Sequence, residues 1–117
     1  MHTLTEHDLT IEQSEHSLVA HLGGNLSIRN AAEVHRVLLD AWRHAASDRE
    51  LIVDLANTRH IDSSGVGVLL ELVSDGVPLS LCNLQTSPRR LLDRTGLSTI
   101  FRVHNNCANS PAHPQAA

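Results

Sequence analysis

The chain has 117 residues, 41% of them apolar and 19% charged, which suits one domain with a modest hydrophobic core. Nine basic and thirteen acidic residues give a net charge of −4. This charge excludes the basic footprint expected of a domain that binds nucleic acid or an anionic membrane. The two aromatic residues, Trp42 and Phe101, are too few to form the stacking platforms of single-strand binders.

Targeting and cofactor signals are weak. No stretch approaches 18 apolar residues, and the start of the chain lacks a basic region followed by an apolar run, so we expect a cytoplasmic protein. The nine histidines are scattered without metal-ligand spacing, and we expect no metal and no other cofactor. Cys82 lies in an apolar run and Cys107 in a polar tail, so we expect no disulfide between them.

Strand and helix patterns alternate from residue 9 onward. Residues 9–12 and 18–22 are predicted as two short strands, the second ending at Gly23-Gly24-Asn25. Asn30, three residues before Glu33, resembles a capping box and predicts the start of a helix. The apolar stripe of this helix consists of Ala31, Val34, Leu38, Ala41 and Ala45.

The next two elements follow from an apolar run and a helical spacing. Residues 51–55 predict a buried strand, and a helix follows from Ser64 with an apolar face at Val66, Leu69, Leu70 and Val73. Val68 and Leu72 lie off that face, and either burial on both sides of the helix or a contact patch explains them. We expect Ile61, Leu69 and Leu92 in the core.

The C-terminal elements complete the pattern. Residues 79–84 predict a strand, and Ser87-Pro88 predicts a helix start with the serine as cap and the proline in the first helical position. That helix is expected to end at Gly96 in a left-handed cap. Residues 100–103 predict the last strand, and residues 105–117 are predicted to be a disordered tail.

The resulting order, β-β-α-β-α-β-α-β, predicts an α/β fold. Right-handed crossovers would place the helices against a mixed sheet of about five strands. We expect residues 1–104 to form this one domain.

Residues 60–67 read His-Ile-Asp-Ser-Ser-Gly-Val-Gly at the predicted turn between a buried strand and a helix. Ser63 could cap the helix there and present its Oγ beside unpaired backbone N–H groups. His60 lies three residues earlier and could tune the site, because imidazole titrates near neutral pH. Taken alone, these residues are better explained by a plain helix start.

The element order and three local signatures resemble the STAS domain, the fold of bacterial anti-sigma factor antagonists. The first signature is the strand 51–55 followed by residues 61–70, and the second is the helix and turn of residues 87–97. The third is Gly24-Asn25-Leu26, a weaker match to the Gly-x-Leu-Asp of the family. The resemblance covers roughly residues 8–104.

The resemblance implies a binding switch. In the family, the serine directly after the aspartate is phosphorylated by an anti-sigma factor that is also a serine kinase, and here that serine is Ser63. The unphosphorylated protein binds the anti-sigma factor and frees the sigma factor, and phosphorylation releases the kinase. The expected phosphosite and partner-binding environment consists of Asp62, Ser64, Gly65, Ser27 and Asn25.

A phosphate dianion on Ser63 would be favoured by the helix dipole and by N–H groups near Gly65 and Val66. We therefore expect phosphorylation to leave the fold intact and to act through local bulk and charge. Ser27 stands where the family usually has aspartate, and the interval from Gly65 to Pro78 is about one helical turn shorter than in the family.

Two other functions were weighed against this one. The same fold serves as a scaffold subunit in stress-signalling complexes and as a cytosolic subunit of lipid-transport ABC systems. An enzyme is disfavoured, although Ser63, Asp62 and His60 are near neighbours, because catalytic triads assemble from distant segments. Ile61 also stands where a nucleophile elbow needs glycine.

Overall fold

The structure, a computed structural model, describes residues 9–14, 16–45 and 49–104. Its centre is a five-stranded sheet in the order β1-β2-β3-β4-β5, in which β1 pairs antiparallel with β2 and the other neighbours are parallel. This is the predicted α/β fold with the predicted order of elements. The elements are β1 (Leu9–Gln13), β2 (Ser17–Leu26), α1 (Ala31–His44), β3 (Glu50–Ile61), α2 (Ser63–Ser74), β4 (Leu79–Cys82), α3 (Thr86–Arg94), a 3-10 turn (Leu97–Thr99) and β5 (Arg102–His104).

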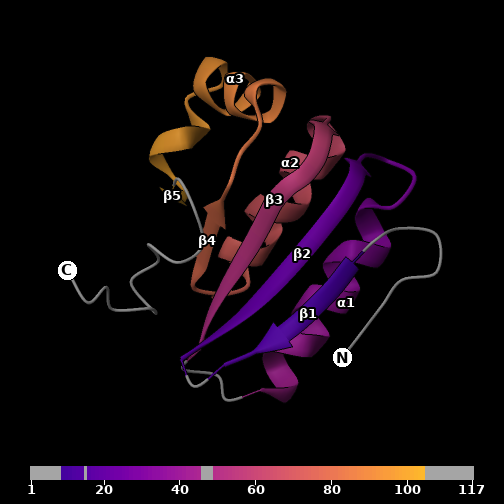
Figure 1. Ribbon diagram of the computed structural model, residues 1–117, viewed down its shortest axis with the longest axis vertical. Coiled ribbons are helices and arrows are strands. Elements are labelled where there is room, and N and C mark those ends of the chain that lie inside the picture. Colours follow the sequence, from indigo (N-terminus) through magenta and orange to yellow (C-terminus); the bar gives the residue numbers. More distant parts are fainter. Residues whose placement is uncertain (1–8, 15, 46–48, 105–117) are drawn as a thin grey trace.

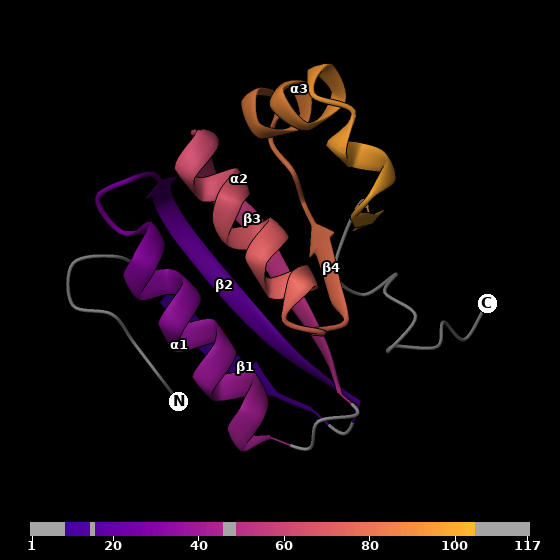
Figure 2. The ribbon, with the colours of Figure 1, turned by 180° about the vertical axis from the view of Figure 1, so that it is seen from behind.

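The helices α1 and α2 lie side by side on one face of the sheet, and the opposite face is turned toward the viewer in Figure 1. The reverse view shows α1 over β1 and β2, and α2 over β3 (Figure 2). α3 lies beyond the end of β4 and contacts β3. The main core fills the space between the sheet and α1 and α2, and it contains the three expected core residues Ile61, Leu69 and Leu92.

The glycines of β2 do not end the strand, contrary to prediction. β2 continues to Leu26, with shifts in its register against β3 between His21 and Gly23 and between Gly24 and Asn25. Gly24 has a φ of +82°, a conformation that glycine adopts at no steric cost. The strand therefore absorbs its glycines as bulges.

β3 runs on to Ile61 and is much longer than the predicted strand 51–55. The second half of β3 is mostly polar and exposed, but the side chains of Thr58 and Ile61 are buried. This extension carries the chain directly into the 60–67 motif.

Helix starts also differ from the sequence patterns. Asn30 precedes α1, but its side chain makes no capping bond to the helix, so the predicted capping box does not form. α3 begins at Thr86 after Gln85, which places Pro88 third in the helix rather than first. Gly96, with a φ of +75°, does follow α3 in the predicted left-handed conformation.

On α2, Val68 and Leu72 are buried with 4% and 0% exposure, so the contact-patch alternative is wrong for them. Val73 is instead 38% exposed and lies outside the buried face. None of the helices in the described residues is long and apolar enough to cross a membrane.

Cys82 is disulfide-bonded, so the expectation of no disulfide is wrong. In the sheet, Cys82 at the end of β4 pairs with His104 of β5. Cys107 and the tail predicted at residues 105–117 lie outside the described residues.

Candidate functional site

The turn between β3 and α2 is built around Asp62. Its Oδ1 accepts a hydrogen bond from the backbone N–H of Gly65 at 3.0 Å, and its backbone is extended, so Asp62 is the N-cap of α2. Ser63 was expected to cap this helix, but it occupies the first helical position instead. Asp62, and not Ser63, therefore supplies the side-chain cap of α2.

Asp62 also ties this turn to the loop between β2 and α1. Its backbone N–H donates to the carbonyl oxygen of Leu26 at 3.1 Å, and its Oδ2 accepts from the backbone N–H of Ile28 at 3.3 Å. One carboxylate oxygen thus accepts from the first turn of α2, and the other accepts from the loop between β2 and α1. One side chain fixes two segments that are 34 residues apart in sequence.

Ser63 is exposed and Ser64 is half-buried. As the first two residues of the helix, their backbone N–H groups have no carbonyl acceptor within it. The N–H groups of Gly65 and Val66, in contrast, are occupied by the Asp62 carboxylate and the Asp62 carbonyl, the latter at 3.0 Å. Free donors beside the serine hydroxyl therefore come from Ser63 and Ser64, two residues earlier than the sequence suggested.

Gly65 is required by close packing. A Cβ at this position would lie 2.7 Å from Cγ2 of Ile61 and 2.7 Å from the carbonyl oxygen of Leu26. Those distances are shorter than real Cβ contacts, and the carbonyl cannot move without disturbing its bond to Asp62. The glycine lets the start of α2 lie directly against the end of β2.

The remaining expected site residues are Asn25, near the end of β2, and Ser27, in the loop that follows it. Both are joined by the buried side chain of Asn30, whose Oδ1 accepts from the Ser27 N–H at 2.9 Å and whose Nδ2 donates to the Asn25 carbonyl at 2.8 Å. The carbonyl of Ser27 also accepts from the N–H of Ala31 at 2.8 Å. The structure therefore brings all the expected site residues to one end of the sheet, around Asp62.

Comparison with known proteins agrees with this architecture. A family model described as the STAS domain matches residues 8–110. The chain belongs to the STAS domain family.

Its relatives include anti-sigma factor antagonists. The chain is 28% identical over 109 residues to an anti-sigma F factor antagonist from Paenibacillus polymyxa, a match that covers 88% of this chain and 92% of the relative. It is similar in fold to an anti-sigma factor antagonist from Mycobacterium paratuberculosis, with a TM-score of 0.78, 16% identity and coverage of 88% and 89% of the two chains.

A second solved structure is the phosphorylated form of SpoIIAA, a Bacillus cell fate determinant. The TM-score is 0.59 at 20% identity, with 83% of this chain and 91% of that chain covered. At these identities the two solved structures show a shared fold, and the sequence relative makes this an antagonist-like STAS protein at modest identity.

The surroundings of Ser63 in this STAS domain do not form a catalytic triad. Nδ1 of His60 lies 3.4 Å from Oγ of Ser87 on α3, so the hydroxyl that His60 contacts belongs to another serine. Asp62 is engaged with backbone N–H groups rather than with an imidazole. The adjacency of these residues in the sequence therefore does not become a nucleophile–base pair.

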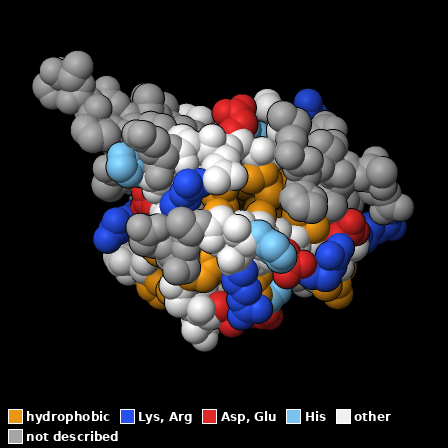
Figure 3. Space-filling view, turned by 90° about the horizontal axis from the view of Figure 1, so that it is seen from below, with side chains coloured by type: hydrophobic (Ala, Val, Ile, Leu, Met, Phe, Trp, Pro, Cys, Tyr) orange, Lys and Arg blue, Asp and Glu red, His pale blue; other side chains and the backbone are white. Residues whose placement is uncertain are grey.

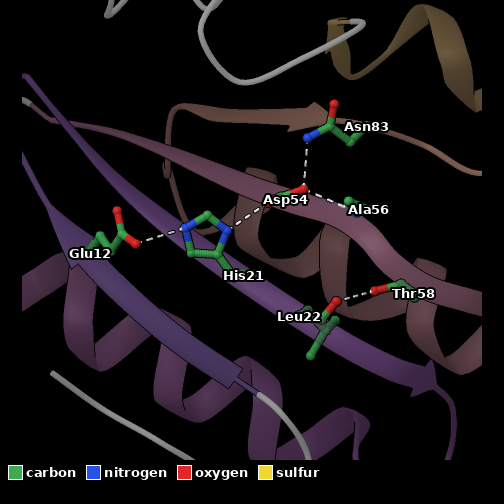
Figure 4. A network of polar contacts seen from close by, with 7 residues as sticks. All are labelled: Glu12, His21, Leu22, Asp54, Ala56, Thr58 and Asn83. Carbon is green, nitrogen blue, oxygen red and sulfur yellow. Dashed lines mark hydrogen bonds and ion pairs between the residues drawn. The ribbon is translucent and has the colours of Figure 1, made fainter.

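A different histidine and aspartate do meet, on the sheet face away from α1 and α2 (Figure 4). Nδ1 of His21 lies 2.6 Å from Oδ2 of Asp54, and Nε2 of His21 lies 3.3 Å from Oε1 of Glu12. Asp54 Oδ1 also accepts from the Asn83 side chain at 2.9 Å and from the Ala56 N–H at 3.0 Å. The network links β1, β2, β3 and the end of β4 and contains no hydroxyl or thiol nucleophile.

The charge on Asp54 is stabilised by these contacts. Burial alone would raise the pKa of Asp54, but the hydrogen bonds from Asn83, Ala56 and His21 outweigh it and hold the pKa below its ordinary value of 3.8. A carboxylate inside the apolar run 51–55 must be paired in this way. That rule could have revealed the network from the sequence, although it could not have named His21 as the partner.

The exposed side chain of Ser63 lies outside two hollows of the described residues. A hollow of about 810 Å³ lies between β1, β2 and the end of α1, and another of about 740 Å³ lies over the His21–Asp54 pair. Ser63 lines neither of them. No cluster of three or more His, Cys, Asp or Glu side chains within the described ranges could hold a metal ion. An exposed hydroxyl on an open surface is suited to contact with another protein.

Proposed function

We propose that this STAS domain is an anti-sigma factor antagonist, a cytoplasmic binding protein and not an enzyme. It would bind an anti-sigma factor that is also a serine kinase, and phosphorylation of Ser63 would end that binding. One observation carries the proposal: Ser63 is exposed at the N-terminus of α2 directly after the capping Asp62. The curated relative from Paenibacillus polymyxa, an anti-sigma F factor antagonist, supplies the class of partner.

The local geometry supports a switch of binding without refolding. A phosphate on Ser63 would add about 1.5 to 2 negative charges at the positive end of the helix dipole. The N–H groups of Ser63 and Ser64 have no acceptor within α2 and can meet the new oxygens. Because the Gly65 and Val66 donors stay with Asp62, the helix cap need not open.

The same geometry explains why binding would change. The carboxylate of Asp62 stays close to the modified residue, so phosphorylation places two like charges side by side on an exposed surface. A partner that packs against the neutral serine would meet added bulk and a concentrated negative charge. SpoIIAA, which shares the fold, has been solved in a phosphorylated form, which makes a phosphorylated state of this domain compatible with the fold.

The test is a phosphotransfer experiment with the purified serine-kinase anti-sigma factors of the host organism, each incubated with the protein, Mg²⁺ and ATP. We expect one of them to add a single phosphate, mapped by mass spectrometry to Ser63. Ser64→Ala is the matched control, because Ser64 is the adjacent serine in the same helical turn. It should still be phosphorylated, whereas Ser63→Ala should not.

Phosphate on Ser64, or no phosphate from any of these kinases, would contradict the proposal. Stable binding of an anti-sigma factor that is indifferent to Ser63 would instead favour the scaffold role. The binding measurement is needed because Ser27 stands where the family usually has aspartate. Ser27 lies in the loop that Asp62 holds beside Ser63.

A further inference from the structure

The most exposed large hydrophobic side chain among the described residues is Ile28, at 77%. It lies in the loop between β2 and α1, and its backbone N–H donates to Asp62 at 3.3 Å. The other two exposed large hydrophobics, Ile100 at 53% and Val73 at 38%, lie after the 3-10 turn and near the end of α2. Ile28 alone of the three is bonded to the residue next to Ser63.

The loop that carries Ile28 is fixed at both ends. Asn30 is 2% exposed, and its side chain bonds to the Ser27 N–H and to the Asn25 carbonyl. The backbone N–H groups of Asn30 and Ala31 both donate to the Ser27 carbonyl, at 3.1 and 2.8 Å. Hydrogen bonds therefore hold the segment before and after Ile28, and the Ile28 N–H is itself bonded to Asp62.

An exposed isoleucine on a fixed loop is suited to binding. Leaving it in water forgoes the free energy of burying its side chain, which a partner with an apolar socket would recover. Because the backbone is already held, docking loses little conformational freedom there. The neighbours Arg29 and Asp62 are charged and exposed, so the surface is an apolar point within a polar rim, the pattern of a protein interface.

We propose that Ile28 is the apolar anchor of the surface that Ser63 controls, and that it inserts into an apolar socket on the anti-sigma factor. This inference rests on the proposed function. Ser27 has no charge, and recognition at this loop would depend on apolar contact with Ile28. Asp62 is the positioning residue, because it holds the Ile28 backbone against the turn that bears Ser63.

The surface at the opposite end of the sheet is different in character. Seen from below, acidic, basic and histidine side chains are interspersed with hydrophobic ones across that end (Figure 3). At the Ser63 end, in contrast, one exposed isoleucine lies on a fixed loop beside the capping aspartate.

The chain offers a matched control for this inference, since Ile28 and Ile100 are both exposed isoleucines outside helices and strands. Ile28→Ser and Ile100→Ser should both fold, with melting temperatures close to that of the wild type. The affinity of each unphosphorylated variant is then measured by titration with the purified anti-sigma factor that phosphorylates Ser63. We expect Ile28→Ser to bind at least tenfold more weakly, about 1.4 kcal/mol, and Ile100→Ser to bind as the wild type does.

A second measurement needs no partner. In the isolated protein, Asp62→Asn should speed hydrogen exchange at the Ile28 amide by at least tenfold, because an amide side chain has one acceptor oxygen where the carboxylate has two. The Asn30 amide, which donates to a backbone carbonyl, should be affected less. An unchanged Ile28 amide would contradict the positioning role of Asp62.

Failure of this inference can be distinguished from failure of the proposed function. Equal binding by Ile28→Ser and the wild type, with Ser63 phosphorylation still abolishing binding, would overturn the anchor and leave the switch standing. Weak binding by Ile28→Ser, with no effect of Ser63 phosphorylation, would support the anchor and overturn the switch. Absence of binding to every anti-sigma factor tested would overturn both.

Discussion

Gly65 and Gly67 lie in the same helix but have opposite surroundings, and this pair tests the packing of the candidate site. A Cβ on Gly65 would lie 2.7 Å from Cγ2 of Ile61 and 2.7 Å from the carbonyl oxygen of Leu26, whereas a Cβ on Gly67 would meet nothing within 4 Å. Overpacking at a tight site costs about 1–3 kcal/mol. Replacing an unhindered helical glycine by alanine gains about 0.5–1 kcal/mol.

We therefore expect Gly65→Ala to lower the free energy of unfolding by about 1–3 kcal/mol and Gly67→Ala to raise it by about 0.5–1 kcal/mol. Urea unfolding followed by circular dichroism measures both, and unchanged slopes would show that each variant still unfolds in one step. If Gly65→Ala were as stable as Gly67→Ala, the start of α2 would not lie against β2 as described.

Three further predictions concern the core and the sheet. Leu69→Ala, at a site with 1% exposure, should lower the free energy of unfolding by about 2–5 kcal/mol in the same assay, and a loss below about 0.5 kcal/mol would show that α2 faces the other way. The buried Thr58 hydroxyl donates to the Leu22 carbonyl at 2.5 Å, so Thr58→Val should cost about 0.5–1.5 kcal/mol by removing that hydrogen bond, and a neutral effect would argue against the bond. Asp54 has a lowered pKa in the folded protein, so its charge stabilises the fold above the unfolded pKa and this stabilisation is lost as the pH falls. The advantage of the wild type over Asp54→Asn in urea unfolding should be complete at about pH 6 and shrink below about pH 4, whereas an advantage that grows toward acid pH would contradict the assignment.

The order of elements was readable from the sequence because each element has a strong local pattern. The apolar run 51–55 and the helical spacing around Leu69 are examples, and both lie in the core as predicted. The end of β2 was not readable in this way. Its glycines are typical of a turn, but Gly23 and Gly24 pair with Asn57 and Thr58 of β3, and this pairing continues the strand through them.

The candidate site was located by the sequence but not resolved by it. Asp62 and Ser63 are both good helix caps, and local preference does not choose between them. The choice is made by the Leu26 carbonyl and the Ile28 N–H, which meet Asp62 only after folding. Ile28 itself gave no signal, because a single apolar residue in a loop acquires meaning only from its exposure and its neighbours.

In the proposed function, the charge state of Ser63 controls binding to an anti-sigma factor. The most direct measurement is the affinity of one protein preparation for its purified anti-sigma factor before and after stoichiometric phosphorylation at Ser63, with folding checked in both states. We expect tight binding before phosphorylation, loss of at least tenfold in affinity afterwards, and an unchanged circular dichroism spectrum. Equal affinity in the two states would contradict the account, and so would loss of affinity caused by unfolding.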